Sequence, residues 1–427
     1  MKNGYKPMSA REIAGRIARR ELRVEEVVRA CLERIAEREA AVGAWACLEP
    51  DAVLAEARRL DARGVDGPLR GVPLGVKDII DTIEYPTAYG SPIYAGHRPA
   101  WDAACVARAR AAGALVLGKT VTTEFATYFP GKTANPHDPT ATPGGSSSGS
   151  AAAVADGMVP LAYGTQTAGS VIRPAAYCGV VGFKPSFGRI SRAGVKSLSE
   201  SLDTIGIFAR DVADAALFAG VLAGRDEAMA APGGLPRIGV CRTSAAGQAE
   251  DAALATLEAA ASTLSQRGAQ VADHDLPAAF EGLFVAQSEI MAVEAGHALH
   301  YEFSNHADRL SAPLQQLLAA GRAVGPARHD AHVALAGQCR AQFHAVFADV
   351  DVLMTLSAPG EAPAGLAATG NPVCNRIWTL LGAPCIHLPC ATGPRGLPLG
   401  VQLVGRPGDD ARLLAAADAV FRVLRAI

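Results

Sequence analysis

Short apolar runs of strand length alternate with longer amphipathic segments along most of this 427-residue chain. The strand-like runs include 114–117, 159–163, 352–355, 386–388 and 400–404, and the longest helix-like segments are 24–40, 249–267 and 327–347. This alternation is typical of α/β proteins, in which helices cover the faces of a buried sheet. The sequence therefore predicts a layered α/β fold with a mixed β-sheet at its core.

Local sequence patterns predict further helices and strands along the chain. Ser9 and Glu12 form a capping-box pattern before the apolar positions of a first helix. A third N-terminal helix is predicted at 51–60, followed by a Gly/Pro-punctuated strand region at 67–76. Additional helices are expected near 102–112 and 149–156, and additional strands near 237–240 and 270–272.

Composition excludes several classes of protein. The chain is 49% hydrophobic and 19% charged, which is the composition of a folded chain with a large core and not of a disordered one. A formal net charge of −2 gives no overall attraction for a polyanion, so nucleic-acid binding is not predicted. No apolar run approaches the roughly 20 residues that cross a bilayer, and no signal peptide is recognisable.

The nine cysteines indicate a reducing compartment. Their number is odd, no C-x-x-C motif occurs, and most lie inside apolar stretches such as Cys385-Ile-His-Leu-Pro-Cys390. Free thiols buried in a core are typical of cytoplasmic proteins. We therefore expect a cytoplasmic location.

Two segments match the sequence patterns of a P-loop and a nucleophile elbow but lack the structural context that these motifs require. Gly113-Ala-Leu-Val-Leu-Gly-Lys-Thr120 fits the P-loop pattern, but a helical segment precedes Gly113 and the residues after it resemble a buried strand. Gly113 is therefore predicted to end a helix. Gly145-Ser-Ser-Ser-Gly149 fits the nucleophile elbow of α/β-hydrolases, but the three prolines in 135–143 exclude the strand that this elbow requires.

Histidines of the second half offer a weak metal pattern. His297 and His300 are three residues apart on a predicted helix, with Glu294 and His306 nearby. Histidines at such spacing are more often exposed or satisfied by structural hydrogen bonds, so we predict no metal site.

Three segments carry the polar chemistry. The first ends an apolar run at Lys77, where burial disfavours the ammonium form and allows the amine to act as a base. A structural pair with Asp78 or Asp81 explains this lysine equally well. The second, Gly144-Gly-Ser-Ser-Ser-Gly-Ser150, presents hydroxyls and free amides where an Ala-rich helix begins. A flexible linker is the alternative for this segment.

The third segment is Tyr163-Gly-Thr-Gln-Thr-Ala-Gly-Ser-Val-Ile-Arg-Pro174. Its small residues allow close approach of a substrate, and its successive backbone amides are suited to hold a developing oxyanion. Ser170 stands before a predicted short helix, where it is a candidate nucleophile or only a helix N-cap.

In this order, the three segments resemble the amidase signature family. The serine-rich loop and the 164–170 element have the spacing of that family, with 24 residues from Ser146 to Ser170, and Cys178-Gly-Val-Val-Gly-Phe-Lys-Pro185 completes the pattern. The dense match covers 67–210, and weaker likeness continues through 352–363, 375–389 and 397–408. Lys77-Asp-Ile-Ile-Asp-Thr82 and Asn375-Arg-Ile-Trp-Thr379 are most similar to the bacterial malonamidase branch.

The resemblance implies a Ser–cis-Ser–Lys triad. Ser170 would be the nucleophile, Ser146 the bridging serine after a cis peptide bond, and Lys77 the base. The oxyanion would be held by the amides of Thr167, Ala168, Gly169 and Ser170. The resemblance implies no metal and no organic cofactor.

The chain departs from the commonest family pattern at three positions. Gln166 replaces an Asp, Ala168 replaces a Gly, and Arg173 follows the nucleophile by three residues where most members place the arginine after two. In the malonamidase branch this arginine helps bind the substrate carboxylate, so Arg173 and Gln166 are candidate substrate-binding residues. A structural ion pair is the alternative role for Arg173.

Apolar residues near the signature suggest a hydrophobic substrate group. Tyr128 and Phe129 precede the serine-rich loop, and the helix expected to supply a second polar contact reads Glu289-Ile-Met-Ala-Val. These residues favour an acyl or leaving group such as that of an aryl amide, anilide or carbamate.

By resemblance, residues 1–427 form one amidase signature domain. Its parts are an N-terminal helical segment (1–65), a signature core (67–210), and a remainder (211–427) that is expected to form much of the substrate pocket. The predicted activity is hydrolysis of a small carboxamide, anilide or carbamate through an acyl-enzyme.

Three alternatives to this activity remain at the level of sequence. They are a malonamate-type amidase using Arg173, the amidase subunit of a tRNA-dependent amidotransferase, and a catalytically silent binding protein. Subunits of the second type are usually longer and keep an Asp at the position of Gln166. We expect a small-molecule amide or carbamate as the partner, with no nucleic acid and no membrane; a homodimer is left open.

Overall fold

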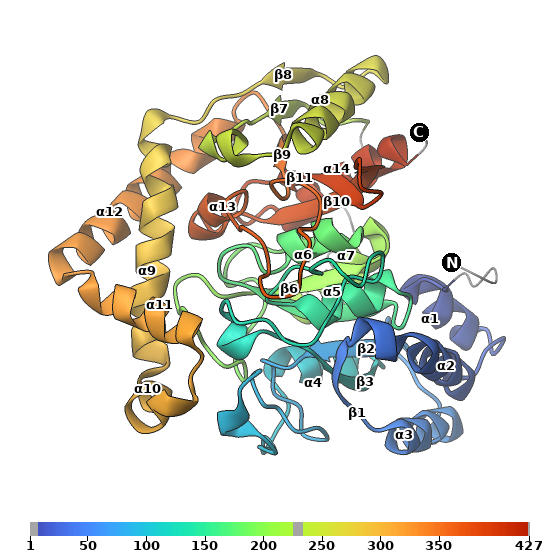
Figure 1. Cartoon of the computed structure of the whole chain (residues 1–427). Helices are drawn as coiled ribbons and strands as arrows, with labels where there is room; N and C mark the ends of the chain where they lie inside the picture. The colour runs from blue at the N-terminus through green and yellow to red at the C-terminus, as the bar shows by residue number, and fades with distance from the viewer. Residues whose placement is uncertain (1–6, 225–233, 426–427) are drawn as a thin grey trace.

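The computed structural model describes residues 7–224 and 234–425 (Figure 1). Within them, one eleven-stranded sheet runs through the molecule in the order β1-β3-β2-β4-β6-β5-β10-β11-β9-β7-β8. The strands are β1 (Trp45–Leu48), β2 (Pro73–Lys77), β3 (Leu115–Thr120), β4 (Leu161–Gln166), β5 (Val181–Lys184), β6 (Thr204–Ala209), β7 (Ile238–Val240), β8 (Val271–Asp273), β9 (Val352–Leu356), β10 (Cys385–Thr392) and β11 (Pro398–Val404).

The sheet is mixed, as predicted. Strand β2 is parallel to β3 and β4, and β7 is parallel to β8 and β9. The strands between these groups, from β4 through β6, β5, β10 and β11 to β9, pair antiparallel. Because the central pairs join β5 to β10, the signature core and the later part of the chain share one continuous sheet and form a single α/β domain.

Fourteen α-helices surround the described part of this sheet (Figure 1). They are α1 (Ala10–Ala18), α2 (Val24–Val42), α3 (Pro50–Arg63), α4 (Ala104–Ala111), α5 (Ser148–Ala155), α6 (Ile172–Cys178), α7 (Val212–Ala223), α8 (Asp251–Gln266), α9 (Leu283–Ala298), α10 (His300–His306), α11 (Ala312–Ala323), α12 (Pro326–Phe343), α13 (Arg376–Leu380) and α14 (Asp410–Leu424). Helices α9 to α12 form a separate layer along one side of the sheet, drawn in gold and orange in Figure 1.

Helices cover both faces of the central strands. In β4, the ring of Tyr163 packs against Phe218 of α7, and its hydroxyl donates to the Cys105 carbonyl of α4. The next residue, Gly164, faces Ser147 and Val171 at the starts of α5 and α6. Because successive strand residues point to opposite faces, α4 and α7 lie on one face and the serine-rich loop lies on the other.

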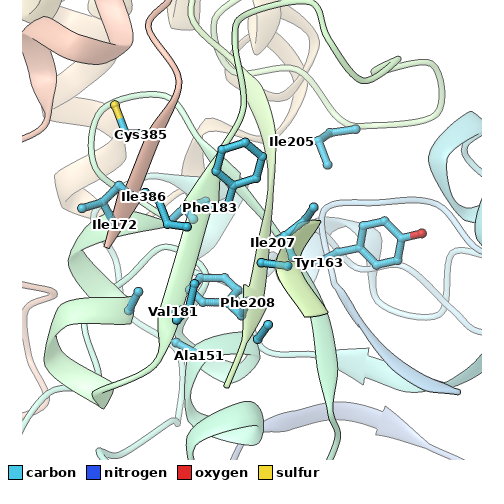
Figure 2. Packing of buried hydrophobic residues seen from close by; sticks show 14 of the residues in the cluster. Ala151, Tyr163, Ile172, Val181, Phe183, Ile205, Ile207, Phe208, Cys385 and Ile386 are labelled. Atoms are coloured by element: carbon cyan, nitrogen blue, oxygen red, sulfur yellow. The ribbon is translucent and has the colours of Figure 1, made fainter. Parts of the chain in front are cut away.

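The core between these layers is apolar and closely packed. Figure 2 shows side chains of β5, β6 and β10 meeting residues of α5 and α6, including Phe183, Ile207 and Ile386. Tyr163 and Phe208 are completely buried in the same cluster. The ends of β2 and β4 and the serine-rich loop are therefore held in place by this closely packed core.

Most local predictions match the observed elements. Ser9 caps α1 by accepting from the Glu12 amide, as the capping-box pattern predicts. Gly113 follows α4 at φ 92°, and Lys119 and Thr120 lie inside β3, which confirms that this segment is not a P-loop.

Other local predictions are wrong in extent or incomplete. The strand predicted at 67–76 begins only at Pro73, because residues before it form turns. Helix α12 ends at Phe343, and a 3₁₀ turn covers His344–Phe347. Strands β1, β5 and β6 were not predicted, since short apolar runs without turn residues on both sides give no clear period.

Two composition-based expectations can be compared with the structure. In 7–224 and 234–425, no helix is long and apolar enough to cross a membrane. All nine cysteines are free thiols, as expected.

Candidate active site

Lys77 is the last residue of β2 and its side chain is completely buried. Its Nζ donates to Ser146 Oγ at 2.7 Å and to Thr165 Oγ1 at 2.8 Å. No carboxylate in the described ranges lies within ion-pair distance of it: Asp78 instead pairs with Lys119 at 3.1 Å, and Asp81 accepts from Tyr89. The structure thus excludes the alternative in which Lys77 is paired with a neighbouring aspartate.

Burial controls the charge of Lys77. Loss of hydration holds the pKa of this amine well below the usual lysine value, and the negative charge of Asp203 raises the pKa in partial opposition. A lowered pKa favours the neutral amine, which has a lone pair available for a proton.

The serine-rich loop brings Ser146 to this amine. The peptide bond between Gly145 and Ser146 is cis, as the family resemblance implies. Ser147 fixes the loop on β4, because its hydroxyl accepts from the Thr165 amide at 3.2 Å and also lies 3.3 Å from the Thr165 carbonyl. Helix α5 starts directly afterwards at Ser148, so this segment is a helix-opening loop and not a flexible linker.

Ser170 lies on the loop that connects β4 to α6 and lines a pocket; among the described residues it forms no hydrogen bond with Ser146 or Lys77. The pocket is lined by Ala126, Thr127, Tyr128, Thr167, Ala168, Gly169, Ser170, Arg173, Leu198, Met291, Leu317 and Pro372. Ser170 is only 8% exposed, and α6 begins two residues later at Ile172.

Three backbone amides of this loop have no acceptor. Within the described part of the chain, the N–H groups of Ala168, Gly169 and Ser170 donate no hydrogen bond to backbone or side chains. Buried amides are almost always paired, so three consecutive amides without acceptors at a pocket are free to donate to an oxygen of a bound molecule.

Arg173 also lines the pocket, and it is fully buried. Its Nη2 donates to the Gly145 carbonyl at 2.6 Å and to Thr369 Oγ1 at 3.1 Å, while Nε and Nη1 have no partner among the described residues. Burial lowers its pKa to about 10. No carboxylate in 7–224 or 234–425 forms an ion pair with Arg173, so the predicted structural ion pair is absent from the described residues.

Gln166 is placed differently from the prediction. Its Oε1 accepts from the amides of Val171 and Ile172, and its Nε2 donates to Thr379 Oγ1 at 2.9 Å. The side chain is completely buried and is absent from the pocket lining. Gln166 therefore caps α6 from within the protein, and the prediction that it contacts substrate is not supported by this geometry.

The two predicted aromatic contacts differ from each other. Tyr128 lines the pocket, whereas Phe129 is 49% exposed and lies outside the lining. Most of the lining comes from 67–210, and the part beyond 211 contributes only Met291, Leu317 and Pro372. The expectation that 211–427 forms much of the substrate pocket stays a prediction.

Sequence reasoning missed several side chains that hold the site together. Gln287 of α9 donates to the Thr167 carbonyl at 3.0 Å, and Thr379 of α13 donates to the Ala168 carbonyl at 2.8 Å. Asp203 accepts from Thr167 Oγ1 at 2.5 Å and from the amide of Leu198, which lines the pocket. Gln287, Thr379 and Asp203 lie 36 to 211 positions from Thr167 and Ala168, and no local motif could have marked them.

No metal site is apparent in the described ranges. They contain no group of three or more His, Cys, Asp or Glu side chains arranged to hold an ion, and this includes His297, His300, His306 and Glu294. Glu294 instead accepts hydrogen bonds from Ser199 and Ser201.

The three sequence segments thus contribute a buried lysine hydrogen-bonded to Ser146, and a second serine, Ser170, that lines a pocket next to amides without acceptors among the described residues. The Amidase family matches residues 26–414 of this sequence. The chain belongs to this family and is an amidohydrolase that acts on C–N bonds.

Known proteins of the family are similar over the whole chain. A glutamyl-tRNA(Gln) amidotransferase subunit from Chloroflexus aggregans is 36% identical over 473 aligned positions, which cover 98% of this chain and 96% of that one. A crystal structure of an amidase superposes with a TM-score of 0.89 at 30% identity, covering 97% of this chain and 99% of the other. The peptide amidase of Stenotrophomonas maltophilia gives a TM-score of 0.83 at 29% identity, with 99% and 98% covered.

Proposed function

We propose that this enzyme hydrolyses the C–N bond of a small amide through Ser170, Ser146 and Lys77. Neutral Lys77 takes the hydroxyl proton of Ser146 while Ser146 takes that of Ser170, and Ser170 Oγ forms a bond to the carbonyl carbon. The carbonyl oxygen becomes an oxyanion facing the amides of the 168–170 loop. The proton returns by the same route to the leaving nitrogen as the C–N bond breaks.

Water completes the cycle in this proposal. It attacks the acyl-enzyme, its proton passes to Lys77 through Ser146, and the acid is released as Ser170 regains its proton. All groups needed for these transfers belong to the chain or to water.

One observation carries the proposal: the Nζ of a buried lysine, which has no carboxylate partner among the described residues, lies 2.7 Å from the hydroxyl oxygen of Ser146. A purely structural lysine in such a place would be expected to have a compensating charge, as Lys119 has in Asp78. The unpaired amides next to Ser170 support the same interpretation.

Substrate class follows from the pocket lining. Tyr128, Met291 and Leu317 provide apolar walls suited to a small carboxamide, anilide or carbamate. The unpartnered Nε and Nη1 of Arg173 favour, as a second candidate, an amide whose acyl part carries a carboxylate, as in the malonamidase branch.

Similarity to amidotransferase subunits favours another candidate, in which the chain is the amidase subunit of a tRNA-dependent amidotransferase. The alignment with the Chloroflexus protein has more positions than this chain has residues, so that relative carries insertions that this chain lacks. We favour the independent amidase acting on a small molecule, since the proposed proton transfers use only residues of this chain and water. The nine free thiols favour a location in the cytoplasm.

The test is hydrolysis by the purified chain alone. A panel of small carboxamides, anilides, carbamates and dicarboxylic monoamides should yield at least one substrate, with turnover lost in Ser170→Ala. Release of ammonia only after a partner protein is added would favour the amidotransferase candidate. No turnover with or without partners would overturn the proposal.

A further inference from the structure

Each peptide plane of the 167–170 loop is fixed through its carbonyl oxygen. In a trans peptide, the N–H of one residue points opposite to the C=O of the residue before it. An interaction that holds the carbonyl on one side therefore directs the next amide to the other side. The unpaired amides of Ala168, Gly169 and Ser170 follow the carbonyls of Thr167, Ala168 and Gly169.

All three carbonyls have donors. Gln287 Nε2 of α9 donates to the Thr167 carbonyl at 3.0 Å, and Thr379 Oγ1 of α13 donates to the Ala168 carbonyl at 2.8 Å. The Gly169 carbonyl accepts from the backbone amide of Arg173 at 3.0 Å, within the start of α6. Two of the three donors are thus side chains from helices more than 100 residues further along the chain.

Gln166 determines the direction of the Thr379 hydrogen bond. Two backbone amides face one side-chain atom of Gln166, so this atom must be the oxygen, and the Nε2 group must face Thr379. The Thr379 oxygen accepts from Gln166, and its single proton remains for the Ala168 carbonyl. The other carbonyl near this hydroxyl, that of Asn375, is more distant at 3.3 Å.

This network gives a physical reason for glutamine at position 166. An aspartate can accept from the helix amides, but its carboxylate cannot donate to Thr379. A carboxylate facing Thr379 would attract the threonine proton and release the Ala168 carbonyl. Of glutamine and glutamate, which have the same shape, only ionised glutamate lacks a donor, so glutamine alone both accepts from the α6 amides and donates to Thr379.

We propose that Thr379, Gln287 and Gln166 are positioning residues that aim the amides of Gly169 and Ala168 at the oxyanion. Thr379, oriented by Gln166, sets the amide of Gly169, and Gln287 sets the amide of Ala168. This inference rests on the proposed function, because it needs an oxyanion at the 168–170 loop.

The experiment compares four variants with the wild-type chain. Thr379→Val removes the donor at nearly constant shape, Thr379→Ser keeps it, Gln166→Glu reverses its direction, and Gln287→Leu removes the second donor. Ser288→Ala, on α9 beside Gln287, is the matched control, since its hydroxyl donates to the Phe284 carbonyl, accepts from Arg376 and forms no hydrogen bond with the loop among the described residues. For each we measure kcat and KM for the best amide of the panel, and the inhibition constant of phenylboronic acid, which forms a tetrahedral adduct with a serine.

Loss of one oxyanion donor costs about 100- to 1,000-fold in kcat, and a misaimed donor should cost less, about tenfold. We expect kcat to fall about tenfold in Thr379→Val, Gln166→Glu and Gln287→Leu at nearly unchanged KM, with phenylboronic acid weakened by a similar factor. Thr379→Ser and Ser288→Ala should behave as wild type. Circular dichroism and thermal melting check that each variant folds. If Gln166→Glu fails to fold, the comparison of Thr379→Val with Thr379→Ser still tests whether the Thr379 hydroxyl positions the loop.

The outcomes separate the inference from the proposed function. Full activity and unchanged boronate inhibition in Thr379→Val and Gln287→Leu would overturn the inference while the amidase function stands. Equal losses in Thr379→Val and Thr379→Ser would also overturn it, because the hydroxyl would then not be responsible. Absence of both turnover and boronate inhibition in the wild-type chain would overturn the proposed function and the inference together.

Discussion

A methyl group at position 169 should disable catalysis while leaving the fold intact. An ideal Cβ at Gly169 would lie 2.4 Å from Asn375 Oδ1 and 3.0 Å from Pro372 Cβ, whereas ordinary contacts begin at 3.4 Å. Relieving the closer contact requires a movement of about 1 Å, and a misplacement of about 1 Å at reacting groups can cost about 100-fold in rate. We therefore expect Gly169→Ala to lower kcat about 100-fold.

The assay is steady-state hydrolysis of the best amide of the panel, with kcat and KM determined separately. Gly296→Ala is the matched control, because no heavy atom lies within 4 Å of the added Cβ on α9. Asn375→Ala in the Gly169→Ala background should restore part of the loss by removing the atom in contact, when corrected for Asn375→Ala alone. A kcat of Gly169→Ala within threefold of wild type, or no recovery in the double variant, would refute the reasoning.

Three further predictions address the base, the substrate and the core. Burial lowers the pKa of Lys77, and its neutral form is proposed to act as the base, so kcat/KM should rise with pH through that lowered pKa and level off below the usual lysine range. Lys77→Arg should be inactive. A rise of kcat/KM only near the ordinary lysine pKa of about 10.4 would contradict the assignment. Arg173→Met should reduce kcat/KM for carboxylate-bearing amides about 10- to 100-fold more than for neutral ones, and equal losses would make the residue structural. Phe208→Ala, at a fully buried position of β6, should lower the free energy of unfolding by about 3–5 kcal/mol in urea titrations, and a loss under about 1 kcal/mol would show that the cluster in Figure 2 is less tightly packed than described.

Residues in local motifs could be located from the sequence. Lys77 ends an apolar run, Ser146 stands in a Gly/Ser loop before a helix, and Ser170 lies two residues before the next helix. Their places at the ends of these elements follow from the local motifs, and their proposed catalytic roles follow from the resemblance to the amidase signature family. The mixed sheet was likewise predictable from the alternation of its strands and helices.

Residues brought in from distant elements could not be located in the same way. Gln287 and Thr379 reach the 167–168 carbonyls only because α9 and α13 pack beside that loop. Position 166 was recognised as unusual, but sequence does not tell which way a side chain faces, so a capping glutamine was taken for a substrate ligand. Phe129 was misjudged for the same reason, since only its neighbour Tyr128 turns into the pocket.

The most direct measurement of the central claim is peptide mapping by mass spectrometry after treatment with a fluorophosphonate. The proposed proton transfer predicts one added phosphonyl group, on the peptide that contains Ser170, with labelling strongly slowed in Lys77→Met and Ser146→Ala. A label on any other residue, or equally rapid labelling of Ser170 in Lys77→Met, would contradict it.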